Sequence, residues 1–177
     1  FYINRDGSIN FPDIGKINVA GLTLKDASDL IKLKVDAAYI STNVFINLDV
    51  IRDVNILISG DAKNPGIYTL TGNSNILHAL TAAGGINDYG SYREINLIRD
   101  GSVIETLDIY DILINGNYKI KTRLRSGDVV FVEARKKIIT VNGAVNRPAK
   151  YEITDNEFLS SAINFSNGLK NTADLDN

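Results

Sequence analysis

Hydrophobic and polar positions in the first 52 residues follow a pattern that predicts a small α+β unit. Residues 7–12 and 14–19 read as two short strands, and residues 44–51 alternate as a third. Between them, Thr23 is followed three residues later by Asp26, a start that resembles a capping box with Asp in place of the usual Glu. The apolar residues that give the predicted helix its buried face are Leu24, Ala27, Ile31 and Val35. We therefore expect this stretch to fold as a separate unit.

The rest of the chain contains an internal repeat, in which residues recur 83 positions later, as Gly60 and Gly143 do. Further matched pairs are Ile58 and Val141, Pro65 and Pro148, Tyr68 and Tyr151, Ile76 and Leu159, Leu80 and Ile163, and Gly85 and Gly168. The alternative is two unrelated strand–turn–strand units that share turn chemistry, because Gly and Pro mark many turns. The second copy stops after about half its length. The repeat therefore predicts one full module and part of another.

Both copies have the same predicted order of elements. An apolar strand, residues 54–59 in the first copy and 137–142 in the second, leads into a turn around a proline and a short strand with a tyrosine. A helix follows, for which Asn73 and Ser74 are the predicted N-caps and Gly84-Gly85 the stop signal. The helix is expected to pack on a sheet through Ile76, Ala79, Leu80 and Ala83.

The first copy continues with three more strands. Residues 94–99 and 102–107 are joined by an Asp-Gly turn at 100–101, the strongest hairpin signal in the chain. A helical turn over residues 108–113 and a strand over 128–133 complete the copy. Strands wrapped around one helix, in the order strand-strand-helix-strand-strand, describe a β-grasp.

Composition narrows the class of protein. The 177 residues are 44% hydrophobic and 23% charged, as in folded proteins that bury a core, and the net charge of −2 offers no general attraction for nucleic acid or anionic membrane. Without cysteine the chain has no disulfide, thiolate nucleophile or Cys-ligated metal. Without methionine Phe1 cannot be a genetic start, so we expect a processed or trimmed fragment. No apolar run approaches the ~20 residues of a membrane-spanning helix.

Candidate catalytic groups are few. The only histidine, His78, is predicted to lie on the helix face opposite the core, where a solvated role is far more common than catalysis. Asp108 and Asp111 could share a helical face as paired acids of glycoside chemistry, but helix capping is the favoured interpretation. The sequence has no GxSxG motif, P-loop or dinucleotide fingerprint. We therefore expect no enzyme, no catalytic residue, no metal and no cofactor.

One charge pattern is less ordinary. Within residues 119–125, four cations alternate with uncharged residues, so an extended chain would point all of them to one side: Lys119, Lys121, Arg123 and Arg125. They can form a strip that contacts anions or another subunit, or a solvated face or charged edge that discourages aggregation. Tyr89 and Tyr92, with Arg93, follow the Gly85 turn and can stack on sugar rings, or be ordinary interface or half-buried residues.

Three stretches resemble the Wza-type outer-membrane polysaccharide export proteins. The run GSINFPDIGKINVAGLTLKDA, residues 7–27, is similar to their export motif. Residues 58–101, which begin ISGDAKNPGIYTL, are similar to their first SLBB module, a soluble-ligand-binding β-grasp. Residues 141–153, VNGAVNRPAKYEI, resemble the start of the second module. The order of the three stretches matches the family as well.

The resemblance implies an α+β fold class, with small modules in tandem. Residues 1–52 would be part of the export domain, 53–135 the first SLBB β-grasp module and 136–177 a partial second module. The family's lipidated N-terminal cysteine and C-terminal membrane-spanning helix are absent from the sequence. The second module is less regular, because Ala149 and Asn167 stand where the first copy has glycine.

The resemblance also implies a function. Proteins of this kind form ring-shaped homo-oligomers in the periplasm, associated with the outer membrane, that pass capsular polysaccharide or exopolysaccharide outward. The implied partners are further copies of the chain, the polysaccharide and an inner-membrane tyrosine-kinase/copolymerase, with no nucleic acid. The alternative is a stand-alone periplasmic module that binds a soluble sugar. The export-motif run favours the exporter, because a bare ligand-binding module would not need it.

Overall fold

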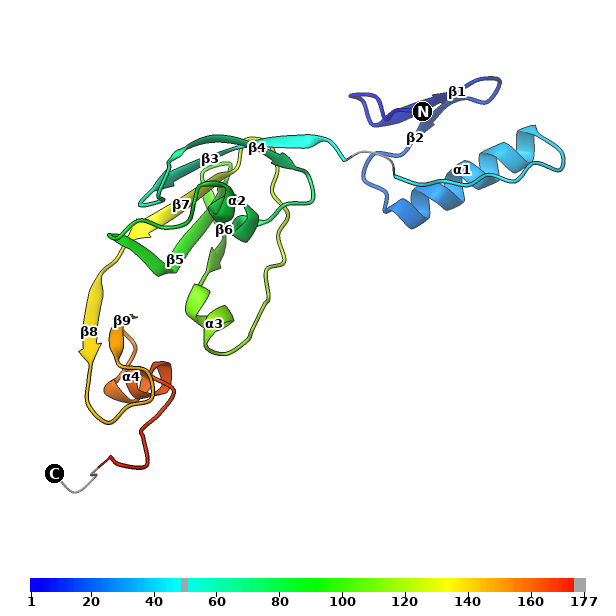
Figure 1. Cartoon of the computed structure of the whole chain (residues 1–177). Coiled ribbons are helices and arrows are strands. Elements are labelled where there is room, and N and C mark those ends of the chain that lie inside the picture. The colour runs from blue at the N-terminus through cyan, green and yellow to red at the C-terminus, as the bar shows by residue number, and fades with distance from the viewer. Residues whose placement is uncertain (49–50, 174–177) are drawn as a thin grey trace. The chain divides into compact units, whose positions relative to one another are not determined.

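The structure of the chain is a computed structural model that describes residues 1–48 and 51–173. It forms two compact units, residues 1–50 and 51–177, each with its own hydrophobic core (Figure 1). Both units combine helices with antiparallel hairpins. The predicted α+β fold class is confirmed.

The first unit is a hairpin packed against one helix. β1 (Ser8–Phe11) and β2 (Gly15–Asn18) pair antiparallel. α1 (Leu24–Ala38) begins after Thr23, whose hydroxyl accepts a hydrogen bond from the Asp26 amide at 3.2 Å, as the sequence predicts. The core of this unit is formed by Ile17, Val19, Ile31 and Val35.

The strand predicted over residues 44–51 is wrong for the part that the structure describes. Residues 44–48 and 51 have no strand pairing, and residues 49–50 lie outside the described residues. The alternation is nevertheless present, since Val44 and Ile46 both pack against the core. Alternation decides which side chains face inward, but a strand also needs a partner for its backbone hydrogen bonds.

One position of the predicted helical face is also wrong. Ala27, Ile31 and Val35 pack in the core, whereas Leu24 is 48% exposed. Helical side chains point back toward the N-terminus of the helix, and Leu24 is the first residue of α1. Its side chain is therefore carried beyond the turns that pack on the hairpin.

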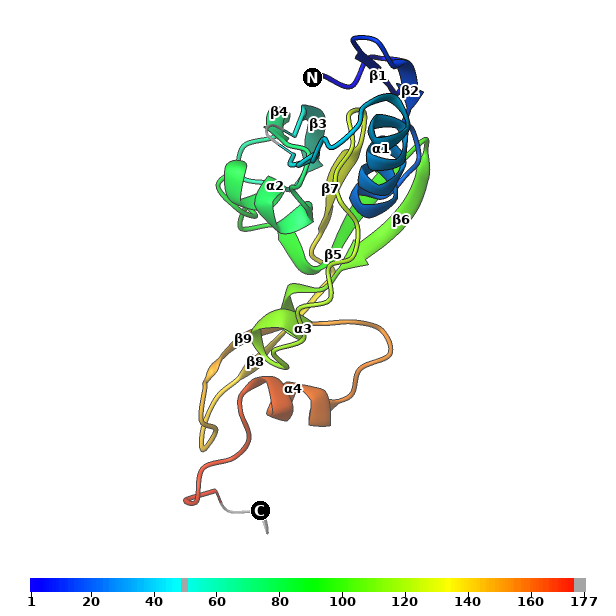
Figure 2. The ribbon, with the colours of Figure 1, turned by 90° about the vertical axis from the view of Figure 1, so that its right-hand side faces the viewer.

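A five-stranded sheet forms most of the second unit (Figures 1 and 2). Its strands are β3 (Asp53–Gly60), β4 (Gly66–Thr71), β5 (Gly90–Arg99), β6 (Ser102–Leu107) and β7 (Val129–Ala134). They lie in the order β4-β3-β7-β5-β6, with β3 and β7 parallel and the other neighbours antiparallel. Two helices accompany the sheet, α2 (Ile76–Ala82) and α3 (Ile109–Leu113). The predicted β-grasp is confirmed.

The core of the β-grasp lies between α2 and one face of the sheet. All four residues predicted for the buried face of the helix are buried there. The strand residues that meet them alternate along each strand and are at most 1% exposed: Ile56, Ile58, Ile95, Leu97, Val130 and Val132. The Asp-Gly turn also forms as predicted, with positive φ at both Asp100 (50°) and Gly101 (76°).

The N-cap of α2 is Asn75, so the prediction of Asn73 and Ser74 is wrong by one residue or more. The Asn75 side chain accepts hydrogen bonds from the amides of Leu77 and His78, while the His78 ring accepts one from the Asn75 amide. Three consecutive polar residues can each cap a helix, so the sequence alone does not choose among them. His78 is exposed, as predicted.

The second copy of the repeat forms β8 (Lys137–Val141), β9 (Ala149–Ile153) and α4 (Leu159–Phe165). β8 and β9 pair with each other, and in both views these elements lie at the end of the β-grasp next to α3 (Figures 1 and 2). α4 begins and ends 83 residues after α2. The repeat predicted from sequence is therefore a repeat of structure.

Hydrogen bonds in the two copies match at the same offset. Tyr68 donates its hydroxyl to the Asn64 carbonyl at 2.7 Å, and Tyr151 donates to the Arg147 carbonyl at 2.6 Å. The bridge between Ala62 and Ile86 recurs between Val145 and Leu169. The two copies therefore share the turn and the tyrosine that fastens it, beyond generic Gly and Pro chemistry.

Candidate functional site

The joint between the two copies is built around Arg93, on β5. Its side chain is only 8% exposed. The guanidinium donates to Asp108 through Nε at 2.8 Å, and to both carboxylate oxygens of Glu157 at 2.8 Å each. It also lies over the rings of Tyr110 (4.8 Å to the centroid) and Phe165 (5.2 Å). One arginine of the first copy thus holds an acid and a ring of the second.

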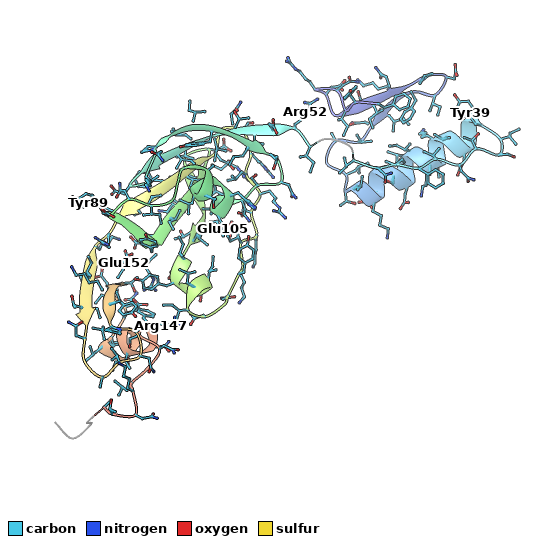
Figure 3. All side chains as sticks on the ribbon, viewed as in Figure 1. Tyr39, Arg52, Tyr89, Glu105, Arg147 and Glu152 are labelled. Carbon is cyan, nitrogen blue, oxygen red and sulfur yellow. The ribbon has the colours of Figure 1, made fainter. Side chains whose placement is uncertain are left out.

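Glu152, on β9, makes a second set of contacts in this joint (Figure 3). The carboxylate is buried and accepts hydrogen bonds from the Ser91 hydroxyl at 2.6 Å and the Tyr92 amide at 2.9 Å. Its own amide donates to the Tyr110 hydroxyl at 2.9 Å. A buried carboxylate is tolerated because hydrogen bonds replace its hydration.

Electrostatics in the joint favour the charged forms of Arg93 and Glu157. The hydrogen bond from Arg93 holds the pKa of Glu157 below its usual range, against the effect of burial. Burial opposes the charge on Arg93, but its hydrogen bonds to Glu157 and Asp108 outweigh it and raise the pKa of the guanidinium. Burial also raises the pKa of the Tyr110 hydroxyl. Arg93 and Glu157 are therefore both ionised at neutral pH.

The second-copy residues of the joint are those that differ from the first copy. Glu152 stands where the first copy has Thr69, and Glu157 where it has Ser74. Phe165 replaces a small residue in the same way, Ala82. The joint was not predicted from sequence, because the residues that the two copies share do not include its contacts. The signal lay in the positions where one copy gains a charge or a ring.

Arg93 therefore lies inside the chain, between the copies, rather than beside the tyrosines predicted with it. Tyr89 is 76% exposed and Tyr92 is 39% exposed. Tyr89 immediately precedes β5, and Figure 3 shows its side chain at the edge of the unit. The structure thus separates the three residues into one that joins the copies and two that reach the surface.

Tyr92 lines a groove of about 440 Å³ between α2, the turn that follows it, and α3. The apolar part of the groove includes Leu77, Ile86 and Ile109, and its polar part includes Lys63 and Asp88. An apolar wall with an aromatic ring and a few polar groups is the usual make-up of a small-ligand site. The groove contains the turn and one of the two tyrosines that the sequence singled out.

The four alternating cations lie on the connection between α3 and β7, residues 114–128, which has no helix or strand (Figure 1). All four side chains are exposed, whereas Ile120 and Thr122 are half-buried and Leu124 is 2% exposed. The predicted alternation is present without a strand. We name residues 118–125 the basic strap.

Each of the paired acids of the sequence analysis accepts hydrogen bonds from nearby residues. Asp108 is the N-cap of α3 and accepts from the Tyr110 amide at 2.8 Å, while its other oxygen meets Arg93. Asp111 accepts from Asn115 at 2.9 Å and Asn117 at 2.7 Å, which lowers its pKa. Within residues 1–48 and 51–173, no three His, Cys, Asp or Glu side chains are grouped as a metal site would need. In the same residues, no helix is both long and apolar enough to cross a bilayer.

Family comparisons match almost the whole chain in three consecutive blocks. Residues 1–50 match the polysaccharide biosynthesis/export protein family. Residues 54–132 and 138–177 each match an SLBB domain, the first over the β-grasp and the second over the second copy. The export domain and the two SLBB modules predicted by resemblance are confirmed.

Curated relatives align over most of the chain. The polysialic acid transport protein KpsD of Escherichia coli is 30% identical over 94% of this chain and 29% of its own length. The EPS I polysaccharide export outer membrane protein EpsA of Ralstonia nicotianae is 30% identical over 84% of the chain and 40% of its own length. The capsule polysaccharide export outer membrane protein CtrA of Neisseria meningitidis is 25% identical over 95% and 43%. The chain thus spans less than half the length of each of these relatives.

Proposed function

Since residues 1–50 belong to the polysaccharide biosynthesis/export family and most of the remainder to SLBB domains, we propose that the chain is part of an export channel for capsular polysaccharide or exopolysaccharide. The observation that carries this proposal is the order of the three domains, together with alignments over 84–95% of the chain to relatives named for transport or export of such polymers. An export domain followed by SLBB modules is more specific than either fold alone.

The role we propose is assembly and passage, without catalysis. Of the acids that could have formed a glycosidase pair, Asp108 caps α3 and binds Arg93, and Asp111 accepts from two asparagine side chains. His78 completes the capping box of α2. These contacts give each candidate group a structural task, and the relatives' names describe transport.

The location and partners follow from the same premise. We propose a periplasmic position associated with the outer membrane, as the relatives' names suggest, and a ring-shaped homo-oligomer around the polymer's path. An inner-membrane tyrosine-kinase/copolymerase is the partner we propose at the inner end of that path. We also keep the domain boundaries of the sequence analysis as a proposal: 1–52, 53–135 and 136–177.

A stand-alone sugar-binding module is the second candidate, and the groove at Tyr92 favours it. Tyr92 offers a half-exposed ring beside Lys63 and Asp88, and Tyr89 lies close by in sequence with most of its side chain exposed. Flat sugar faces pack on such rings while their hydroxyls bind polar rims. We propose the groove as a saccharide contact in either case.

Size in detergent distinguishes the two candidates. We expect the complete gene product, extracted from membranes in detergent, to have the mass of a closed homo-oligomer when measured by light scattering. A strictly monomeric product that binds saccharide would contradict the channel and leave the sugar-binding module.

A further inference from the structure

The basic strap is held in one conformation by hydrogen bonds along its length. The Glu105 carboxylate, on β6, accepts from the amides of Lys121 and Thr122 at 3.1 Å each (Figure 3). The Leu124 amide donates to the Ser74 carbonyl at 2.9 Å, and Arg123 donates to the Asn73 carbonyl at 2.7 Å. A segment fastened in this way presents its outward side chains without a large further loss of entropy on binding.

The outward side chains of the strap are cations without carboxylate partners. The ion pairs of the described residues involve other cations, and none includes a strap side chain. The nearby acids have other hydrogen-bond partners, namely two asparagines for Asp111, Arg99 at 2.7 Å for Asp128 and the strap's own amides for Glu105, but Asp111 and Asp128 still attract Lys119 and Arg125. Because none of the four cations is in an ion pair of the described residues, the strap presents exposed positive charge to an anion from solution.

An aromatic residue, Tyr118, immediately precedes the row of cations. Tyr118, at the start of the strap, is 56% exposed, and its hydroxyl is fixed by a hydrogen bond from the Asn75 side chain at 3.1 Å. A ring held in place beside a row of cations can pack against a sugar face while the cations meet acidic groups. No sequence pattern pointed to Tyr118.

We propose that the basic strap, with Tyr118, binds an anionic polysaccharide whose carboxylates recur along the polymer. Alternating cations on one side of an anchored segment match a linear polymer with repeated charge better than a single small anion, which one or two cations would satisfy. The proposal rests on the proposed export function for the source of the polymer, and it adds the chemical class of that polymer. A net charge of −2 places the attraction in the strap rather than in the chain as a whole.

A binding measurement on the 177-residue chain tests the strap. The probe is polygalacturonate, which carries one carboxylate per sugar, and dextran is the uncharged comparison. The test variant is K119Q/K121Q/R125Q, which leaves Arg123 and its hydrogen bond intact. The control variant K25Q/K32Q/K34Q removes the same number of exposed cations from α1. Circular dichroism and urea midpoints check that each variant is folded.

We expect the strap variant to bind polygalacturonate about tenfold more weakly than the original chain, because three exposed charge contacts are lost. The α1 variant should bind within about twofold of the original chain. Tyr118→Ala should weaken binding, and Tyr118→Phe, which keeps the ring, should weaken it less. Equal binding by the strap and α1 variants overturns the proposal, as does binding of dextran at the same strength. Tighter binding of a single-stranded oligonucleotide with the same dependence on the strap also overturns it.

The failure of this proposal is distinguishable from failure of the export function. If the strap variant of the complete gene product exports as much polymer as the original and that polymer carries no acid, the strap proposal fails while export stands. If deleting the gene leaves surface polysaccharide unchanged, the export function itself fails, whatever the strap binds.

Discussion

The two copies of the repeat share a turn, a tyrosine and a helix, yet they differ in how their helices are buried. α2 packs under a five-stranded sheet, and Ile76 at its start is 0% exposed. The equivalent residue of α4, Leu159, is 75% exposed, and β8 has only β9 as a strand partner in the described residues. The local sequence is thus enough to form the turn and helix of the second copy, while the stability of that copy depends on what it packs against.

The second copy compensates for its poorly buried helix by the contacts of its joint with the first copy. Glu152, Glu157 and Phe165 meet the first copy where Thr69, Ser74 and Ala82 of the first copy have no such task. A repeat unit becomes specific to its position by changing the residues at its contacts while keeping those of its turn. The following predictions compare the copies, beginning with the largest expected difference.

The stabilities of the two copies should differ most in their response to truncation of the first residue of α2 and of α4. We expect Ile76→Ala to lower the free energy of unfolding by about 2–5 kcal/mol, because it opens a cavity in the core. Leu159→Ala should change it by less than about 0.5 kcal/mol, because the side chain is already in solvent. Urea unfolding of the two variants measures both values. Equal losses would show that the second copy has a buried core of its own.

Removing Arg93 should release the second copy and spare the first. We expect Arg93→Met to cost about 2–3 kcal/mol, since Glu157 and Asp108 are partly exposed and the cost is less than for a fully buried pair. Hydrogen exchange should become faster in β9 and α4, while β3 and β7 keep their protection. Arg147→Met, at an exposed arginine of the second copy, is the control. Unchanged exchange in α4 after the loss of Arg93 would contradict the joint.

Acid should loosen the second copy before the first. The lowered pKa of Glu157 means that its stabilisation is complete above its ordinary pKa of 4.5 and is lost as the pH falls through the lowered value. Asp128 of the first copy, whose pKa Arg99 lowers against burial, loses its contribution only below its ordinary value of 3.8. Hydrogen exchange measured from pH 6 down to about 3 should show α4 opening before β7. Glu157→Gln should remove the early step, and an early step that persists in this variant would exclude Glu157 as its cause.

The smallest difference is expected at the tyrosine that both copies have in the turn. Tyr68→Phe and Tyr151→Phe each remove one hydroxyl that donates to a carbonyl four residues earlier. We expect each to cost about 1 kcal/mol, because the two bonds have the same geometry and both acceptors lie at the surface of their turns. Unequal costs, measured by urea unfolding, would show that the turn contributes differently in the two copies.

Much of the fold followed from local patterns, and the rest depended on contacts distant in sequence. Strand alternation, the Asp-Gly hairpin and the glycines after α2 are local signals. The strands, the turn and the helix end of the β-grasp lie where these signals predict them. The strand expected over residues 44–51 failed because pairing needs a partner strand that alternation does not specify. The choice of Asn75 as N-cap depends on tertiary packing in the same way, since the strap holds the Ser74 carbonyl.

The candidate site could be predicted only in part, because some of its contacts join residues that are distant in sequence. The outward direction of the strap cations followed from alternation alone. The burial of Arg93 could not be predicted from its neighbours, because its partners Asp108 and Glu157 are 15 and 64 residues away. Tyr118 carried no pattern of its own, and only the hydrogen bond from Asn75 shows that its ring is held in place at the start of the strap.

The most direct test of the export function is the location of the polysaccharide in cells of the organism that encodes the chain. After deletion of the gene, we expect surface polysaccharide to be lost and polymer to accumulate inside the outer membrane, as measured by fractionation and sugar analysis. Expression of the complete gene product should restore the surface polymer. Unchanged surface polysaccharide in the deletion strain would contradict the account.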